Sequence, residues 1–246
     1  MSFQGKIAVV TGGSSGIGFA IAKYLVNQGA TVVITGRRQQ QLDDAVASIG
    51  GSVTAIKADT GNLDELATMY RDIEAAHGRI DVLVANAGTG ELAVLGELTE
   101  AHFDRIFDTN VKGVTFSIQG ALPLMPQGAS VVIIGSTASM DPGPGLSVYG
   151  ASKAALRNLV RSWIQEIKPS GVRINIVSPG PVDTESLRGM FADNVEETLA
   201  FLRSRSMVSR IGQPEEIARA VAFVASQDAG YINGIELFLD GGASQI

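Results

Sequence analysis

Three residues at a fixed spacing have the types that acid–base chemistry on an oxygen requires. Tyr149 and Lys153 lie four residues apart in a segment of helical periodicity, so both project from one helix face. A phenol with a pKa of about 10 is a poor proton donor or acceptor at neutral pH. Lowering that pKa to about 7 takes about 4 kcal/mol, which one cation about 4 Å away supplies at an effective dielectric near 20. We therefore expect Tyr149 to exchange a proton and Ser136 to hydrogen-bond an oxygen that gains negative charge.

A glycine-rich turn lies near the amino terminus, in the sequence Thr11-Gly12-Gly13-Ser14-Ser15-Gly16-Ile17-Gly18. It follows an apolar run and opens a helical segment, and a helix amino terminus presents free N–H groups and partial positive charge to a phosphate. A purely structural turn is the alternative interpretation. The placement favours a dinucleotide pyrophosphate, with Gly12, Ser14, Ser15, Gly16, Ile17 and Gly18 as its binding residues.

The end of the second apolar run indicates which dinucleotide is bound. It reads Ile34-Thr35-Gly36-Arg37-Arg38, without the carboxylate that would accept the 2′-hydroxyl of NAD. Two adjacent guanidinium groups can form charge-assisted pairs with a phosphate dianion. Alternatively, the two arginines are merely solvated at a helix start. We expect Arg37 and Arg38 to select NADP(H).

The elements that must position these residues alternate along the chain. Strand-like apolar runs occur at Ile7–Thr11, Thr31–Thr35, Val53–Lys57, Asp81–Ala85, Ser130–Gly135, Arg173–Ser178 and Ile235–Leu239. Helical periodicity occupies roughly Gly16–Gln28, Leu63–His77, Glu100–Leu122, Val148–Lys168 and Pro214–Ala225. This order predicts an α/β class, a single-domain Rossmann fold over residues 1–246 whose doubly wound parallel sheet has about seven strands flanked by helices. Between Pro179 and Pro214 we expect a short amphipathic cover, with a substrate lid at about Glu185–Val208.

Composition excludes several kinds of chemistry. The 246 residues contain no cysteine and two histidines, which rules out disulfides, thiolate ligands and a three-histidine metal site, so no metal is expected. A net charge of −6 argues against nucleic acid or an anionic membrane surface as the main partner. No apolar run approaches the ~20 residues of a membrane span, and the first residues lack signal-peptide features, so we expect a cytoplasmic protein. His77 and His102 are expected on solvated helix faces.

The order and spacing of the motifs resemble those of the short-chain dehydrogenase/reductase family, whose chains have about 250 residues. The matching positions are Thr11-Gly12, Gly16-Ile17-Gly18, Asp59, Asn86-Ala87-Gly88, Asn110, Ser136, Tyr149-Gly150-Ala151-Ser152-Lys153, Pro179-Gly180 and the closing Asp240-Gly241-Gly242. Together they span essentially the whole chain.

The resemblance implies further roles for individual residues. Ser136, Tyr149 and Lys153 would be catalytic together with Asn110, which would position a water in a proton relay. Tyr149 and Lys153 would also contact the nicotinamide ribose. Asp59 and Thr60 would lie near the adenine, and the remaining cofactor contacts would come from Asn86, Ala87, Gly88, Pro179, Gly180, Val182 and Thr184. Asp59 capping a turn, Asn110 bonding backbone and a rigid proline turn are the structural alternatives.

The same resemblance implies an NADPH-dependent ketone reductase or secondary alcohol dehydrogenase that takes bulky apolar substrates. Expected pocket walls are Met140–Ser147, the segment after Gly88 and the lid, with Met140, Leu146, Met190, Phe191 and Met207 making them apolar. A 3-oxoacyl thioester reductase is the alternative, although Pro123–Ala129 and Pro169–Gly171 lack the basic residues that would dock an acidic carrier. A non-catalytic NADP-binding regulator is a third possibility, which the retained Tyr149 and Lys153 disfavour.

Assembly follows more weakly from the sequence. The apolar positions Leu156, Leu159, Val160, Trp163, Ile164 and Ile167 recur at helical spacing, and core packing alone would account for them. The resemblance implies a homotetramer built through this helix, its predecessor and a carboxy-terminal strand ending in Ile246.

Overall fold

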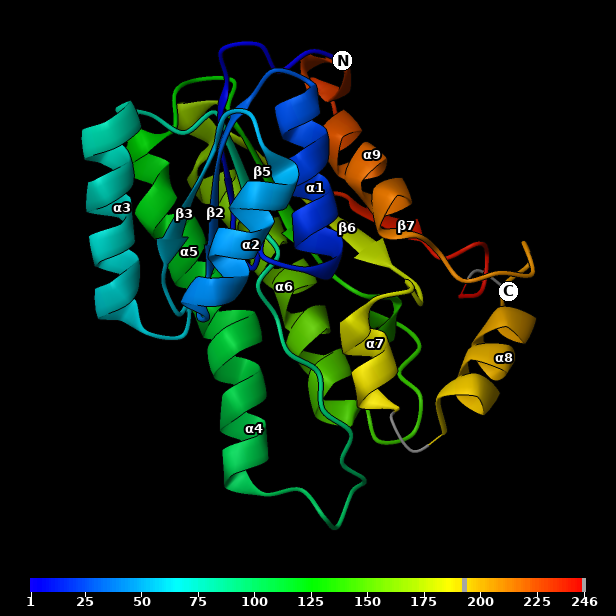
Figure 1. The fold of residues 1–246 in the computed structure, drawn as a ribbon. Coiled ribbons are helices and arrows are strands. Elements are labelled where there is room, and N and C mark those ends of the chain that lie inside the picture. The colour runs from blue at the N-terminus through cyan, green and yellow to red at the C-terminus, as the bar shows by residue number, and fades with distance from the viewer. Residues whose placement is uncertain (192–193, 245–246) are drawn as a thin grey trace.

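The computed structural model describes residues 1–191 and 194–244, and within them one parallel sheet organises the chain (Figure 1). Its strands stand in the order β3-β2-β1-β4-β5-β6-β7, and every neighbouring pair is parallel. The bounds are β1 Ile7–Val10, β2 Thr31–Gly36, β3 Val53–Lys57, β4 Val82–Ala85, β5 Ser130–Ile134, β6 Arg173–Pro179 and β7 Glu236–Leu239. The predicted doubly wound sheet of seven strands is therefore confirmed.

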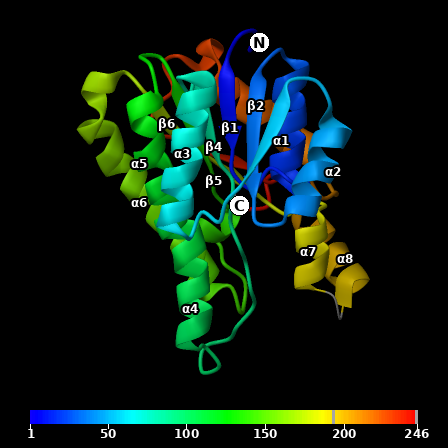
Figure 2. The same ribbon diagram turned by 60° about the vertical axis from the view of Figure 1, so that its left-hand side comes forward.

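Helices cover both faces of the sheet, as Figures 1 and 2 show. The helices are α1 Gly16–Asn27, α2 Gln39–Ile49, α3 Leu63–His77, α4 Glu100–Phe107, α5 Val114–Ala121, α6 Ser147–Glu166, α7 Glu185–Met190, α8 Val195–Arg205 and α9 Pro214–Ala225. Because side chains alternate across a strand, Ala8 and Val10 of β1 pack with α1, α2 and α9, while Val9 packs with α3, α5 and α6. Because all neighbouring strands are parallel, their carboxyl ends lie at one edge of the sheet between these two cores.

Local signals define where several helices begin and end. The Asn62 side chain accepts the N–H groups of Asp64 and Glu65 at the start of α3, and Gly78 ends that helix with φ +71°. Pro214 opens α9, where the Glu216 carboxylate accepts the backbone N–H of Gln213. These are short-range features that a sequence carries explicitly.

Two elements differ from the sequence expectations. The predicted helix Glu100–Leu122 is interrupted by a π-helical segment, η1, at Asp108–Gly113. Helix α2 was not predicted, because only Leu42 and Ala45 of its residues are fully buried and its apolar signal is weak. The last strand ends at Leu239, as the apolar run Ile235–Leu239 predicted, and the carboxy-terminal end at Ile246 lies outside the described residues.

The two histidines differ in their surroundings. His77 is partly exposed at the end of α3, but His102 on α4 is buried, so the expectation of a solvated face is wrong for His102. Its Nδ1 lies 3.6 Å from Oε2 of Glu91, which Arg105 also contacts through two hydrogen bonds. These contacts attach the segment after β4 to α4. None of the helices in the described residues is both long and apolar enough to span a membrane.

Candidate active site

A cavity of about 720 Å³ opens at the carboxyl ends of the strands, where doubly wound sheets bind ligands. Every residue predicted to bind the cofactor lines it, and Ser136, Tyr149 and Lys153 line it as well. Of the predicted catalytic and cofactor-binding residues, Asn110 is the one that does not line the cavity. The topology therefore collects the others from seven separate segments of the chain into one space.

The glycine turn takes a shape that only glycine allows at its key positions. Gly12 and Gly16 have φ values of +64° and +53°, in the region that side chains disfavour. A Cβ on Gly18 would lie 2.3 Å from the Gly12 carbonyl oxygen, so α1 starts directly against the turn. The result is a cradle of backbone at a helix amino terminus, which suits a pyrophosphate.

Asn86 holds this cradle in place. Its Nδ2 donates to the carbonyl oxygens of Thr11 and Gly12, at 2.9 and 3.0 Å, and its backbone N–H donates to Thr11 Oγ1. The N–H of Ala87 donates to the same hydroxyl at 3.0 Å. Thr11 was part of the motif but had no predicted role; its position at a strand end directly before the turn is the signal that could have identified one.

The far end of the cavity carries unpaired cations. Arg37 and Arg38 are exposed, line the cavity and have no ion-pair partner in residues 1–191 and 194–244. Near them, Thr35 Oγ1 and Gln41 Oε1 are buried, line the same cavity and lack a hydrogen-bond partner in that part of the chain. Unsatisfied buried polar atoms are costly unless a ligand engages them. This end therefore fits the polar, anionic end of a phosphorylated adenosine.

Asp59 does what the structural alternative predicted, without leaving the cavity. Its Oδ1 accepts the Gly61 N–H at 2.9 Å, which closes a turn after β3. Asp59 and the buried Thr60 nevertheless both line the cavity. The turn geometry therefore places them there, and the two interpretations are compatible.

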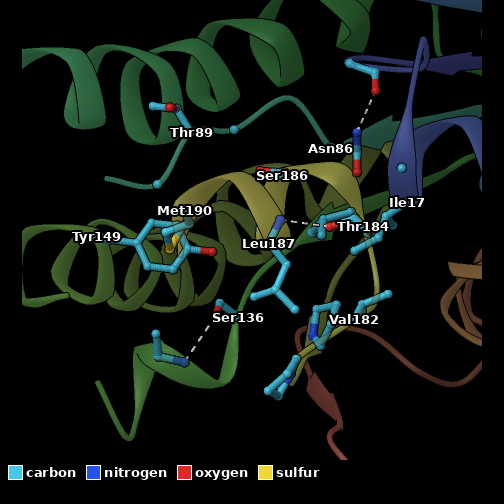
Figure 3. Close-up of a pocket in the computed structure, with 18 of the residues that line it drawn as sticks. Ile17, Asn86, Thr89, Ser136, Tyr149, Val182, Thr184, Ser186, Leu187 and Met190 are labelled. Atoms are coloured by element: carbon cyan, nitrogen blue, oxygen red, sulfur yellow. Dashed lines mark hydrogen bonds between the residues drawn. The ribbon is translucent and has the colours of Figure 1, made fainter. Parts of the chain in front are cut away.

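Tyr149 and Ser136 face each other across the cavity wall (Figure 3). Ser136 is extended after β5, and its Oγ accepts the Ala138 N–H at 3.2 Å, which leaves the hydroxyl proton free to donate. Burial raises the pKa of Tyr149, and the hydrogen bond with Ser136 lowers it in part. In the protein chain by itself the net shift of the Tyr149 pKa is upward; the lowering by Lys153 together with the positive nicotinamide ring of the oxidised cofactor stays a prediction.

Lys153 is buried beside Tyr149. Its Nζ lies 5.8 Å from the centroid of the Tyr149 ring and donates to the Ile134 carbonyl oxygen at 2.8 Å. Burial lowers the pKa of Lys153 to about 8. The ammonium group thus stays close to the phenol but is charged less readily than in water.

Asn110 lies fully buried in the π-helical segment. Its Oδ1 accepts the Thr89 N–H at 2.8 Å, and its Nδ2 donates to Thr89 O and to Ser152 Oγ. A Cβ on Gly88 would lie 3.3 Å from Asn110 Oδ1 and 3.4 Å from Lys153 Nζ. The side chain bonds the Thr89 backbone, as the structural alternative predicted, and also the Ser152 hydroxyl; neither partner was predicted. A role of Asn110 in a proton relay stays a prediction.

The turn after β6 forms the wall next to α1. Gly180 fits there because a Cβ would lie 2.7 Å from Asp240 Cβ. Val182 is buried, and Thr184 Oγ1 accepts the Leu187 N–H at 3.2 Å as the cap of α7 (Figure 3). Thr184 Cγ2 would lie 3.4 Å from a Cβ on Gly16, so the glycine turn and this turn are adjacent.

Helices α7 and α8 close the remaining side. Met190 packs near Tyr149, since a Cβ on Gly90 would lie 2.8 Å from Met190 Cε and 3.4 Å from Tyr149 Cδ2. Arg205 of α8 pairs with Asp141 at 2.8 Å and joins this cover to the loop after β5. Of the predicted apolar lining, Leu146, Met190 and Phe191 are present, but Met140 and Met207 are exposed and do not line the cavity. Residues 192 and 193 of the predicted lid lie outside the described residues.

Comparison with known proteins places this geometry in a family. Residues 12–244 match a family model described as enoyl-(acyl carrier protein) reductase. An oxidoreductase of Sarocladium schorii is 43% identical, with 98% of this chain and 97% of that protein aligned. Dehydrogenase/reductase SDR family member 4 of Homo sapiens is 36% identical, covering 96% of this chain and 87% of its own. The chain belongs to the short-chain dehydrogenase/reductase family.

Solved structures agree with this assignment. A short-chain dehydrogenase/reductase from Serratia marcescens superposes with a TM-score of 0.92 at 37% identity, over 99% of this chain and all of that one. A short-chain dehydrogenase from Burkholderia cenocepacia in complex with NADP superposes with a TM-score of 0.90 at 36% identity, over 99% of each chain. This short-chain dehydrogenase/reductase is thus an oxidoreductase of a family that binds a nicotinamide cofactor. In the described residues no group of three or more His, Cys, Asp or Glu side chains could hold a metal ion.

Proposed function

We propose that this enzyme is an NADPH-dependent carbonyl reductase and secondary alcohol dehydrogenase. The observation that carries the proposal is the half-buried Tyr149 and Ser136 pair beside the buried Lys153, in a cavity whose other end carries two arginines without an ion-pair partner in the described residues. The glycine turn, Arg37 and Arg38 would hold the dinucleotide. NADPH, when bound, supplies the hydride.

The residues around the carbonyl oxygen divide the remaining work. Ser136 has a free hydroxyl proton with which to hold the substrate oxygen and stabilise developing negative charge. Tyr149 donates the proton that converts this oxygen into an alcohol, and takes it back in the oxidative direction. The Lys153 ammonium stabilises the tyrosinate left behind, which offsets the effect of burial.

The proposed substrates are bulky, apolar ketones and secondary alcohols. Apolar side chains from four segments line the cavity together with Tyr149: Leu92, Leu146, Leu187, Met190, Phe191, Phe201 and Leu202. The match to a family model of enoyl-(acyl carrier protein) reductases supports acyl thioesters as the alternative substrate class. Against it, neither Pro123–Ala129 nor Pro169–Gly171 offers a basic side chain to an acidic carrier.

A substrate panel tests the reaction. We expect oxidation of NADPH with aryl and long-chain ketones to exceed that with 3-oxoacyl thioesters, and the reverse ranking would favour the alternative. Tyr149→Phe removes the proton donor but no charge, so turnover should fall at least ~10²-fold while NADPH binding, followed by fluorescence titration, stays within about twofold. Turnover that survives in Tyr149→Phe would contradict the proposed mechanism.

Cofactor choice has its own test. The double variant Arg37→Ala/Arg38→Ala removes both guanidinium groups, so the Kd for NADPH should rise at least ~10-fold while the Kd for NADH changes little. Arg71→Ala, an exposed arginine on α3 outside the cavity, is the matched control. An unchanged ratio of the two dissociation constants would remove the argument for NADP.

We further propose a cytoplasmic homotetramer. Leu156 and Val160 are fully buried in the core and Leu159, Trp163, Ile164 and Ile167 pack against it, so the stripe on α6 needs no partner chain to explain it. The proposal therefore rests on family resemblance, and light scattering tests it: a mass of one or two chains would be against it.

A further inference from the structure

Glu236 is a buried carboxylate at the start of an otherwise apolar strand. It begins β7, in the sequence Glu-Leu-Phe-Leu, and 7% of its side chain is exposed. It does not line the cavity and belongs to none of the motifs described above. A buried ionised group is costly unless it is paired and hydrogen-bonded, so its partners indicate its purpose.

Its oxygens join three elements. Oε1 accepts the hydroxyl of Ser178 on β6 at 2.7 Å and the hydroxyl of Ser139 at 2.8 Å. Oε2 lies 3.4 Å from Nη1 of Arg157 on α6. The same guanidinium group also contacts Sδ of Met140.

Both serine contacts lead to Ser136. Ser139 ends the single 3₁₀ turn η3, Thr137–Ser139, which Ser136 caps, and its N–H donates to the Ser136 carbonyl oxygen at 3.0 Å. Ser178 packs on Gly135, where a Cβ would lie 2.1 Å from Ser178 Oγ. The residue before Ser136 and the turn after it are thus both held by one carboxylate.

The third contact leads to the helix of the general acid. Arg157 follows Lys153 by four residues and Tyr149 by eight, so the three recur at helical spacing along α6. Glu236 therefore connects the backbone that presents Ser136 with the helix that presents Tyr149.

From these contacts we infer that Glu236 is a positioning residue, which fixes the Ser136 hydroxyl relative to the Tyr149 phenol. The inference rests on the proposed reaction, in which both groups contact the substrate oxygen. Misplacement of a catalytic group by about 1 Å can cost ~10²-fold in rate. The contacts of Glu236, called the tether below, would prevent such misplacement between Ser136 and Tyr149.

A double-mutant comparison with Ser136 tests the inference. Glu236→Ala should lower kcat about 10- to 100-fold with the KM for NADPH within about twofold. In a Ser136→Ala background the same change should cost no more than about threefold, because there is no hydroxyl left to position. An equal cost in both backgrounds, or an unchanged kcat in the first, would overturn the inference.

Two further variants separate positioning from general loss of structure. Glu236→Gln keeps an oxygen acceptor for both serine hydroxyls, so it should retain kcat within about threefold; a loss as large as that of Glu236→Ala would contradict the serine tether. Asp81→Ala, which removes a buried carboxylate at the opposite edge of the sheet, is the matched control. We expect it to lower the stability of the fold and to leave kcat unchanged. If Glu236→Ala does not fold, Ser139→Ala/Ser178→Ala takes its place in the same double-mutant comparison.

Hydrogen exchange gives a reading that does not depend on turnover. The Ala138 and Ser139 amides donate to Ser136, so in Glu236→Ala the peptide spanning 135–140 should exchange at least ~10-fold faster than in Glu236→Gln, with α3 unchanged. Equal exchange in the two variants would defeat the inference even if ketone reduction is confirmed. If the peptide 135–140 exchanges faster in Glu236→Ala but the wild type reduces no ketone, the proposed function is contradicted while the positioning of Ser136 by Glu236 is supported.

Discussion

At the scale of single residues, the burial of Tyr149 and Lys153 opposes the charged forms that their proposed proton transfer needs. Burial raises the pKa of the phenol, and it lowers the pKa of the lysine to about 8. Both shifts favour the uncharged forms. The pair therefore functions only where the Lys153 ammonium is still protonated.

This sets a pH dependence with a definite sign. Lys153 loses its proton as the pH rises through about 8, and the tyrosinate left after proton donation then loses its cation. We expect kcat for ketone reduction to fall above about pH 8, while alcohol oxidation, which needs a deprotonated Tyr149, rises with pH. Initial rates in both directions between pH 6 and about 10 measure this. A reductive profile that is flat across that interval would contradict the role of Lys153; the Arg71→Ala protein should follow the wild type.

At the scale of elements, one arginine secures the end of the helix that packs against α1. Arg173, the first residue of β6, is buried, and its guanidinium donates to the carbonyl oxygens of Val224, Ala225 and Ser226 at the end of α9 and to that of Ile232. The described residues provide no carboxylate partner for it. The guanidinium instead interacts with the negative carboxyl end of the α9 helix dipole. Burial lowers the pKa of Arg173.

Removing this cap should weaken the fold without altering the site. Arg173→Met leaves several buried carbonyl groups unsatisfied, and we expect the free energy of unfolding to fall by about 2–3 kcal/mol. Urea denaturation measures the loss, and kcat of the folded fraction should not change. Arg173→Lys keeps the charge but has fewer hydrogen-bond donors. Its free energy of unfolding should lie between those of the wild type and Arg173→Met. A change smaller than about 0.5 kcal/mol in Arg173→Met would show that water replaces the guanidinium.

What the sequence predicted depended on the range of the interaction. The seven strands and the glycine turn follow from local patterns, because buried parallel strands are apolar throughout and Gly12 and Gly16 mark a turn. The π-helical segment at Asn110 and the burial of His102 depend on distant partners, Thr89 and Glu91, which no pattern within a helix reveals. Met140 and Met207 were assigned to the lining because they are apolar, but their side chains point to solvent. Glu236 did carry a signal, as the only charged residue within its strand.

At the scale of the whole molecule, the two edges of the sheet do different jobs. The cavity occupies the carboxyl edge. At the amino edge, Asp81 is 6% exposed and accepts the Ile7 N–H together with hydrogen bonds from Lys6 and Arg79. Burial raises the pKa of Asp81, but these hydrogen bonds lower it by more, so the net shift is downward.

Acid should therefore unfold the protein in part through Asp81. A carboxyl whose pKa is lower in the folded state stabilises the fold above its unfolded pKa of about 4, and this contribution is lost as the pH falls through the folded value. Urea midpoints at pH 7 and about pH 3 should differ less for Asp81→Asn than for the wild type. Asp64→Asn, an exposed carboxyl near the start of α3, should retain the wild-type difference. Parallel behaviour of Asp81→Asn and the wild type would contradict the assignment.

The position of β7 bears on the order in which the parts of the site can form. Along the chain the glycine turn precedes the Tyr149 helix, and the strand that carries Glu236 follows both. The glycine turn finds its partner Asn86 within the first strands, whereas the carboxylate that holds the backbone around Ser136 lies 97 residues after Ser139. We therefore expect the Ser136 turn to reach its final geometry later in folding than the glycine turn, once β7 has paired with β6.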